Sequence, residues 1–165
     1  MSSPAIDYRA PRSIGITIAF VALVVIVGGL IGINARPDAW YTSLAKAPWN
    51  PPNWVFAPVW FVLYVFIGIA GARTFLHNRS GSTMVLWALQ MLLNWAWSPV
   101  WFQLHQPWLA FAIIVAVFAL ILGFIWRSWR ADRVSAALFL PYALWVGFAS
   151  TLNLAVAVNP RRGVP

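Results

Sequence analysis

The stretch "KAPWNPPNWVFAPVW", residues 46–60, lies between two apolar runs and contains three tryptophans, four prolines and two asparagines. Residues 47–72 carry no charge, and the apolar run ends at Arg73. Asn50 is a favourable N-cap residue and Pro51 a favourable first helical residue, so we expect a helix to begin there. The stretch therefore predicts the point at which a membrane chain passes from a loop into its second span.

The composition supports a membrane protein. Of 165 residues, 62% are hydrophobic and only 8% are charged, unlike soluble globular domains. A helix needs about 20 apolar residues to cross a bilayer core. The uncharged run 80–126 is too long for one crossing and divides at the polar segment 103–107. We expect spans at 14–33, 51–73, 83–103, 107–127 and 134–158 within a single domain, residues 1–165.

The predicted fold class is an all-α integral membrane protein, a five-transmembrane-helix bundle with a long loop between helices 1 and 2, residues 34–50. A loop of this length in a compact bundle is usually functional. Gly28 and Gly32 in the first span predict close packing of a neighbouring helix. Pro58, Pro99 and Pro141 predict kinks in the second, third and fifth spans.

The basic residues predict the orientation in the membrane. Seven of eleven lie on the N-terminal side of the predicted bundle and four on the other, which favours a cytoplasmic N-terminus. The bias is modest, so a dual or inverted topology stays open. Because the charges are scattered over the connections, the net charge of +8 indicates membrane flanks and no nucleic-acid partner. An all-helical design favours a bacterial inner membrane, since spanning proteins of the outer membrane are typically barrels.

Several kinds of site are excluded by the residue types. The three acidic residues lie outside the predicted spans and glutamate is absent, which excludes paired-carboxylate catalysis. His77 and His105 fall in successive connections on opposite sides of the membrane, so they cannot share a metal ion, and cysteine is absent. No metal site and no required cofactor are expected. Proton-coupled transporters normally keep an ionisable residue within the membrane, and none occurs here.

Aromatic and amide residues recur at helical spacing on three predicted spans. Each set lies on one face of its helix, and intramembrane amides favour an inward orientation. The predicted faces are Phe56, Trp60, Tyr64 and Gly68; Gln90, Asn94, Trp97 and Trp101; and Trp145, Ala149 and Asn153. They converge in the outer half of the bundle beneath a loop lid with Arg36, Trp40, Lys46 and Trp49. We expect an aromatic pocket for a large flat ligand with an acidic edge.

A simpler interpretation applies to each residue taken singly. Most tryptophans of membrane proteins lie in the interfacial belt or in packing contacts, and Trp87, Trp126 and Trp129 fit that pattern. Asn94 is equally suited to a hydrogen bond between helices. Only the convergence of three faces beneath one loop favours a pocket.

Three segments resemble the tryptophan-rich sensory protein, or translocator protein (TspO/MBR), family. They are "WYTSLAKAPWNPPNWVFAPVWFVLY" (40–64), "NWAWSPVWF" (94–102) and "LPYALWVGFASTLN" (140–153). The resemblance spans nearly the whole chain. It implies a five-helix bundle, often a homodimer, that binds porphyrins such as protoporphyrin IX and haem. Animal members also bind cholesterol, but Leu154 stands where their motif needs a tyrosine, so sterol binding is not predicted.

The resemblance also implies roles for individual residues. Trp60 and Trp145 match tryptophans implicated in light-dependent protoporphyrin breakdown, and the other matching ligand-lining positions are Tyr64, Gln90, Asn94, Trp108 and Ala149. The predicted function is a membrane tetrapyrrole-binding sensor or carrier, with Trp97 as a further stacking residue. The alternatives are a light-dependent porphyrin-degrading enzyme, with Trp60 and Trp145 as its catalytic residues, and a passive permease or scaffold. The expected partners are a porphyrin or other flat hydrophobic ligand, the lipid bilayer and a second copy of the chain.

Overall fold

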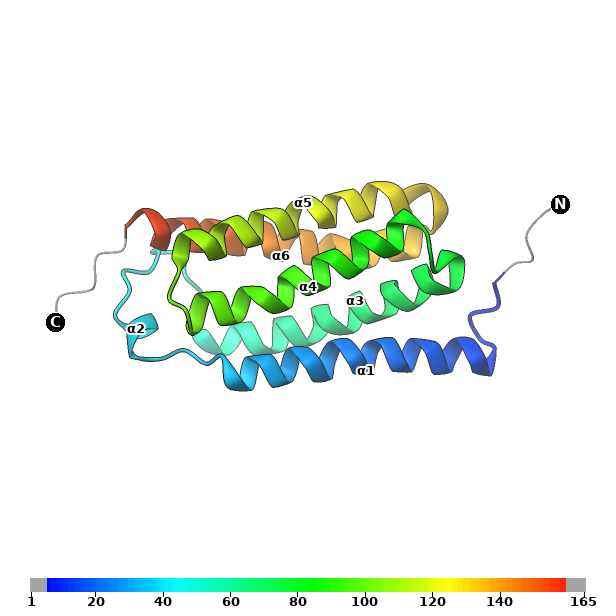
Figure 1. Ribbon diagram of the computed structural model, residues 1–165, viewed down its shortest axis with the longest axis horizontal. Helices are drawn as coiled ribbons and strands as arrows, with labels where there is room; N and C mark the ends of the chain where they lie inside the picture. The colour runs from blue at the N-terminus through cyan, green and yellow to red at the C-terminus, as the bar shows by residue number, and fades with distance from the viewer. Residues whose placement is uncertain (1–5, 160–165) are drawn as a thin grey trace.

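The computed structural model describes residues 6–159. Within these residues the chain forms six α-helices and one 3₁₀-helix, and Figure 1 shows the longer helices side by side along the long axis of the molecule. The elements are α1 (Pro11–Asn34), α2 (Ala39–Thr42), η1 (Asn53–Val55), α3 (Phe56–Asn78), α4 (Ser82–Phe102), α5 (Pro107–Ala131) and α6 (Arg133–Val158). The connection between α1 and η1, residues 35–52, contains the short helix α2.

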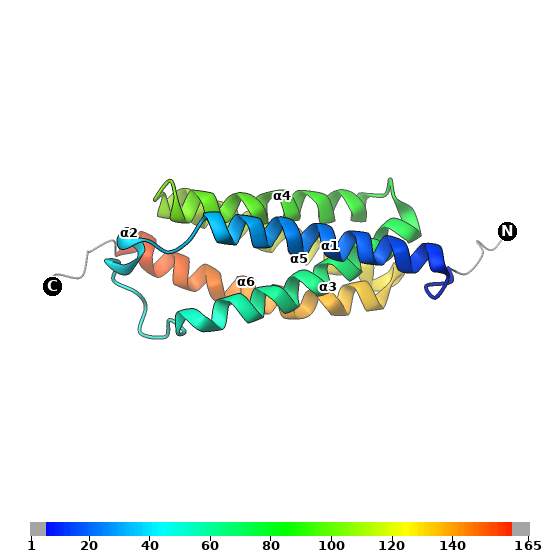
Figure 2. The same ribbon diagram turned by 90° about the horizontal axis from the view of Figure 1, so that it is seen from below.

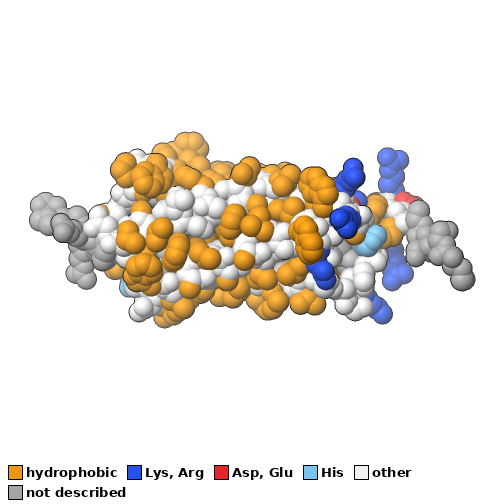
Figure 3. Space-filling view, turned by 90° about the horizontal axis from the view of Figure 1, so that it is seen from above, with side chains coloured by type: hydrophobic (Ala, Val, Ile, Leu, Met, Phe, Trp, Pro, Cys, Tyr) orange, Lys and Arg blue, Asp and Glu red, His pale blue; other side chains and the backbone are white. Residues whose placement is uncertain are grey.

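Four helices of the described chain, α1, α3 with η1, α5 and α6, are long and apolar enough to cross a membrane. Helix α4 has 21 residues but is less apolar, because it carries Gln90, Asn94 and four tryptophans. Hydrophobic side chains cover the length of the bundle, and arginines gather at the end where α1 begins (Figure 3). The chain is therefore an all-helical, multi-pass membrane protein.

The long helices form a ring. Helix α1 packs on α3, α3 on α6, α6 on α5 and α5 on α4, whereas α4 meets α1 more loosely. Two glycines of α3 allow close contacts: Gly68 lies against the backbone of Val21, and Gly71 lies beneath the indole of Trp87. The ring encloses a hydrophobic core that includes the fully buried Ile67, Phe124 and Phe139.

Trp87 is not a belt residue, contrary to the sequence-based expectation. It is only 5% exposed, and its indole Nε1 donates a hydrogen bond to the carbonyl of Ile67 at 2.9 Å. Gly71, one turn farther along α3, leaves room for the ring. Trp126 and Trp129 are exposed on α5, at 75% and 47%, as a belt position requires.

The beginning of the second long helix was predicted wrongly. Helix α3 starts at Phe56 after η1, and the side chain of Asn50 donates instead to the carbonyl of Pro51 at 2.9 Å. The second proline, Pro52, accounts for this, since the helical conformation is disfavoured for a residue that precedes proline. The same shift places Pro58 in the first turn of α3, where a missing N–H costs no helical bond. Pro99 and Pro141 lie inside α4 and α6 as predicted.

An ion pair fastens the end of the bundle where α1 begins. The guanidinium of Arg73 donates to both carboxylate oxygens of Asp132 at 2.8 Å, and it lies 3.9 Å from the ring of Tyr8. Asp132, the single residue between α5 and α6, also accepts from the hydroxyl of Ser135 at 2.6 Å and the amide of Val134 at 3.2 Å. Burial raises the pKa of Asp132, but these hydrogen bonds outweigh it and hold the pKa below the ordinary value. The ion pair thus joins the last turns of α3 to the junction between α5 and α6.

Candidate ligand-binding cavity

A cavity of about 590 Å³ lies between the helices at the opposite end of the bundle, where the connection 35–52 crosses it. Helices α1, α3, α4, α5 and α6 and this connection all contribute to its wall. Figure 2 shows the connection and α2 at the end of the bundle where α1 and α4 finish. The volume falls within the range of about 300–1,000 Å³ found for small-molecule pockets.

The wall formed by α3 and α6 is aromatic. Phe56, Trp60 and Tyr64 follow one another at intervals of four residues on α3 and all line the cavity. Trp145 of α6 completes this wall, with its ring centroid 5.6 Å from that of Phe56. Its Nε1 atom is buried and has no hydrogen-bond partner in the described part of the chain. Such a donor can bind an acceptor atom of a ligand.

The wall formed by α4 holds a stacked indole pair. The rings of Trp97 and Trp101 are 5.5 Å apart and nearly parallel, with an interplanar angle of 12°. Trp97 Nε1 donates to Oδ1 of Asn153 at 3.1 Å, and Nδ2 of Asn153 donates to the carbonyl of Pro107 at 3.0 Å. These hydrogen bonds fix Trp97 against α6 and the start of α5, so the indole face is pre-positioned.

A chain of hydrogen bonds forms the inner end of the cavity. The hydroxyl of Tyr64 donates to Oδ1 of Asn94 at 3.2 Å, and Nδ2 of Asn94 donates to the hydroxyl of Tyr142 at 2.9 Å. Tyr142 in turn donates to Oε1 of Gln90 at 2.9 Å. Tyr64 and Asn94 line the cavity, whereas Tyr142 and Gln90 are fully buried behind them. Three helices are therefore joined by satisfied polar groups, as a low-dielectric interior requires.

The connection 35–52 closes the outer end through a small hydrophobic cluster of its own. Tyr41 and Leu44 are buried against Trp101 of α4, Ala110 of α5 and Val156 of α6. We call this connection the lid. Arg36 and Lys46 of the lid line the cavity, and Nζ of Lys46 lies 4.2 Å from the ring of Tyr41. Two cations therefore stand at the rim of an aromatic cavity.

Contacts that were not predicted attach the lid to the turn between α4 and α5. His105 stacks on Trp40 with ring centroids 4.4 Å apart, and its Nε2 atom lies 2.9 Å from Oδ2 of Asp38. The other oxygen of Asp38 accepts from the amide of Tyr41 at 2.9 Å and so caps α2. The capping pattern, an aspartate three residues before Tyr41, was readable in the sequence. The partner His105 was not, because it lies 67 residues away.

Eight of the twelve predicted site residues line the cavity and four do not. The eight are Trp60, Tyr64, Asn94, Trp97, Trp145, Ala149, Arg36 and Lys46. Gln90 lies behind the wall, and Trp40 packs on His105 and Trp101. Trp49 is 56% exposed. Trp108 is 59% exposed, because the inward face of α5 passes through Ala110, Ile114 and Val117 and leaves Trp108 on the outer side.

The described wall of the cavity is mainly aromatic and apolar. Its described lining contains indoles, phenol rings, amides and two cations, and no carboxylate or imidazole. Within residues 6–159 no three His, Cys, Asp or Glu side chains gather closely enough to hold a metal ion. His77 lies in the last turn of α3, at the other end of the bundle from His105.

Comparison with known proteins agrees with the helical membrane fold. The pattern of the TspO/MBR family matches residues 17–158. A tryptophan-rich protein TspO of Chlorobaculum tepidum is 33% identical over 131 residues, which cover 76% of this chain and 83% of that protein. A tryptophan-rich sensory protein of Cereibacter sphaeroides is 33% identical over 132 residues, covering 79% and 84%. A translocator protein of Ovis aries is 36% identical over 136 residues, covering 76% and 79%. The chain belongs to the TspO/MBR family.

Proposed function

We propose that the protein is a membrane sensor or carrier that binds tetrapyrroles, such as protoporphyrin IX or haem, in the cavity beneath the lid. The observation that carries this proposal is the convergence of Trp60, Trp97 and Trp145 on one cavity whose rim holds Arg36 and Lys46. Indole faces suit a flat macrocycle, and cations suit its acidic edge. The tetrapyrrole itself is what resemblance to the family suggests.

The proposal includes an arrangement in the membrane. Helix α4 acts as a fifth span, since Asn94 and the paired tryptophans face the cavity, where α4 meets the other helices. The arginine-rich end that begins α1 then faces the cytoplasm of a bacterial cell. The lid lies on the outer side of the inner membrane, and the protein functions as a homodimer.

Binding is tested by titrating the purified protein with protoporphyrin IX and following tryptophan fluorescence. We expect saturable quenching at micromolar concentrations or below, lost in the double variant Trp60→Phe with Trp145→Phe. The matched control is Trp126→Phe with Trp129→Phe, which removes two indoles from the outer surface of α5. Unchanged affinity in the first double variant would exclude this cavity as the site.

A second candidate function is light-dependent degradation of the bound porphyrin. It is favoured by the position of Trp60 and Trp145 on the same cavity, because an electron-rich indole beside an excited macrocycle is oxidisable. Illumination of the complex in the presence of oxygen distinguishes the two. If porphyrin absorbance falls only at the rate seen without protein, the protein binds the porphyrin and does not degrade it. If no saturable binding is found, the remaining function is that of a passive permease or scaffold.

A further inference from the structure

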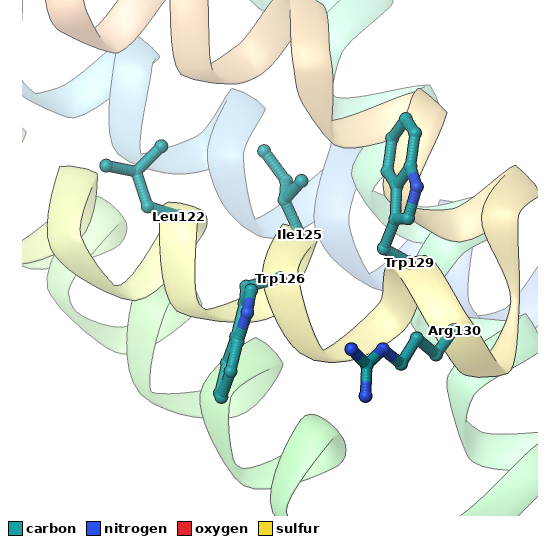
Figure 4. A pocket seen from close by; sticks show the side chains of 5 residues that line it. All are labelled: Leu122, Ile125, Trp126, Trp129 and Arg130. Carbon is teal, nitrogen blue, oxygen red and sulfur yellow. The ribbon is translucent and has the colours of Figure 1, made fainter.

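A shallow groove on the outer surface of α5 lies at the opposite end of the bundle from the cavity. Leu122, Ile125, Trp126, Trp129 and Arg130 form it on the last turns of the helix. Figure 4 shows Trp126 and Arg130 along one edge and the other three side chains along the second edge. Neither the fold nor the ligand cavity requires this groove, since α5 packs inward through other residues, including Ile121, Phe124 and Ser128.

The large apolar side chains of the groove are presented outward. Leu122 is 47% exposed, Trp126 75% and Trp129 47%. In a membrane-spanning helix such residues face lipid, and indoles favour the depth of the headgroups. The groove therefore opens toward the bilayer and not toward water.

The groove has a cationic end and an apolar end, which follow each other along the axis of α5. Arg130 stands at the end nearer the membrane surface, and Leu122 lies eight residues deeper, roughly 12 Å along the helix. Figure 4 shows the Arg130 side chain directed back along the helix toward Trp126, on the same edge of the groove. A phospholipid has the same polarity along its length, with a phosphate above and acyl chains below.

Within the described part of the chain, the Arg130 guanidinium of the groove has no counterion. Asp132, the carboxylate nearest in sequence, is bound to Arg73, and no ion pair of Arg130 occurs among residues 6–159. Arg127 and Arg133 add positive charge at the same end of the bundle. If a second copy in the same orientation bound this groove, the two sets of cations would lie at the same membrane depth and repel each other. A second copy is therefore disfavoured as the partner. An anionic partner is electrostatically favoured.

We infer that this groove binds an anionic phospholipid, with the phosphate on the Arg130 guanidinium and an acyl chain against Leu122 and Ile125 between the two indoles. The site is independent of the proposed tetrapyrrole function. It requires a headgroup with net negative charge, such as that of phosphatidylglycerol, and disfavours a zwitterionic headgroup on the same acyl chains.

Native mass spectrometry of the full chain from detergent tests the inference. The probes are dioleoyl phosphatidylglycerol and dioleoyl phosphatidylcholine, which share their acyl chains. We expect the anionic lipid to be retained about fivefold more than the zwitterionic lipid, since one basic residue near a membrane surface contributes about that factor. Arg130→Gln should remove this preference. Trp126→Ala should reduce retention of both lipids, because it removes the apolar edge.

Arg127→Gln is the matched control. It deletes the same charge one turn away, but Arg127 Nε already donates to the hydroxyl of Ser82 at 3.0 Å. The lipid preference should persist in this variant. Three outcomes would overturn the inference. If the lipid preference persists in Arg130→Gln, the groove is not the binding site. If millimolar glycerol phosphate displaces the lipid, the site binds a free anion, and if a dimer disappears in the groove variants, the groove binds a second copy of the chain.

Discussion

Nε2 of His105, in the turn between α4 and α5, lies 2.9 Å from Oδ2 of Asp38 in the lid. His105 has a φ of 52°, in the left-handed region that L residues rarely adopt. Beside it, Gln103 Nε2 donates to the carbonyl of Asn34 at 3.2 Å. The first contact joins the lid to the turn after α4, and the second joins the end of α1 to the same turn. The lid is therefore held by a few exposed polar contacts in addition to its hydrophobic cluster.

Removal of the Asp38 carboxylate should loosen the lid and leave the bundle unchanged. Asp38→Ala deletes both the cap of α2 and the contact with His105, whereas His105→Ala deletes only the second. Hydrogen–deuterium exchange of residues 39–44 should accelerate in both variants, and more in Asp38→Ala. The pKa of Asp38 is lowered chiefly by the Tyr41 amide and then by His105, against burial. The lid contacts of the wild type are therefore present above the ordinary pKa and lost as the pH falls through the lowered value. Equal exchange in all three proteins would show that the hydrophobic cluster alone holds the lid.

The lid cations should discriminate between porphyrins by their acidic edge. Two partly exposed ion pairs contribute about 0.2–1 kcal/mol each, so protoporphyrin IX should bind about two- to thirtyfold more tightly than its dimethyl ester. Arg36→Gln with Lys46→Gln should remove this difference, as measured by fluorescence titration. Arg79→Gln with Arg127→Gln removes the same charge at the opposite end and should preserve it. If the lid variant still binds protoporphyrin IX more tightly than the dimethyl ester, the acidic edge of the porphyrin does not contact Arg36 and Lys46.

A methyl group at Gly28 should destabilise the protein. A Cβ atom there would overlap the ring of Tyr64, which also donates to Asn94. Overpacking of this kind costs about 1–3 kcal/mol, so Gly28→Ala should lower the melting temperature measured by circular dichroism in detergent. Gly15→Ala is the control, because no atom beyond its own helical turn lies within 4 Å of its Cβ position. Equal melting temperatures for the two variants would contradict the close approach of α1 and α3.

Truncation of Asn94 should disrupt the polar chain at the inner end of the cavity. Asn94→Ala removes the acceptor of the Tyr64 hydroxyl and a donor to Tyr142, and buried polar groups left unpaired cost about 1–3 kcal/mol each. The free energy of unfolding should fall by that order, and ligand affinity should fall with it. Asn34→Ala removes an exposed hydrogen bond to the carbonyl of Leu30 and should change stability by less than about 0.5 kcal/mol. A neutral Asn94→Ala would indicate that the chain is not needed for the packing of α3, α4 and α6.

Neutralisation of Asp132 should weaken the arginine-rich end of the bundle. The pair with Arg73 is partly buried, so Asp132→Asn should lower the free energy of unfolding at pH 7 by about 2 kcal/mol, between the exposed and buried limits. The pKa of Asp132 is lowered in the folded protein. Its contribution is therefore present above the ordinary pKa of 3.8 and lost as the pH falls through the lowered value. The difference in free energy of unfolding between the wild type and Asp132→Asn should therefore disappear over that pH interval. Asp7→Asn, which loses one exposed bond from the amide of Arg9, should show a much smaller gap at pH 7.

The sequence by itself determined the helical membrane class and most of the cavity wall. Apolar runs of membrane length fix the helices, and four-residue spacing fixes which side chains share a face, as for Phe56, Trp60 and Tyr64. These are local properties of one helix. Trp108, which was matched to the pocket by family resemblance alone, lies on the outer side of α5.

Only the tertiary structure decided how the faces meet. Gly71 makes Trp87 a core residue, and the ring order places Gln90 behind Asn94 and Tyr142. The contact of Asp38 with His105 joins residues 67 positions apart, and no periodicity in the sequence encodes it. Such relationships depend on helix rotation and on the path of the lid, which packing of the whole bundle selects.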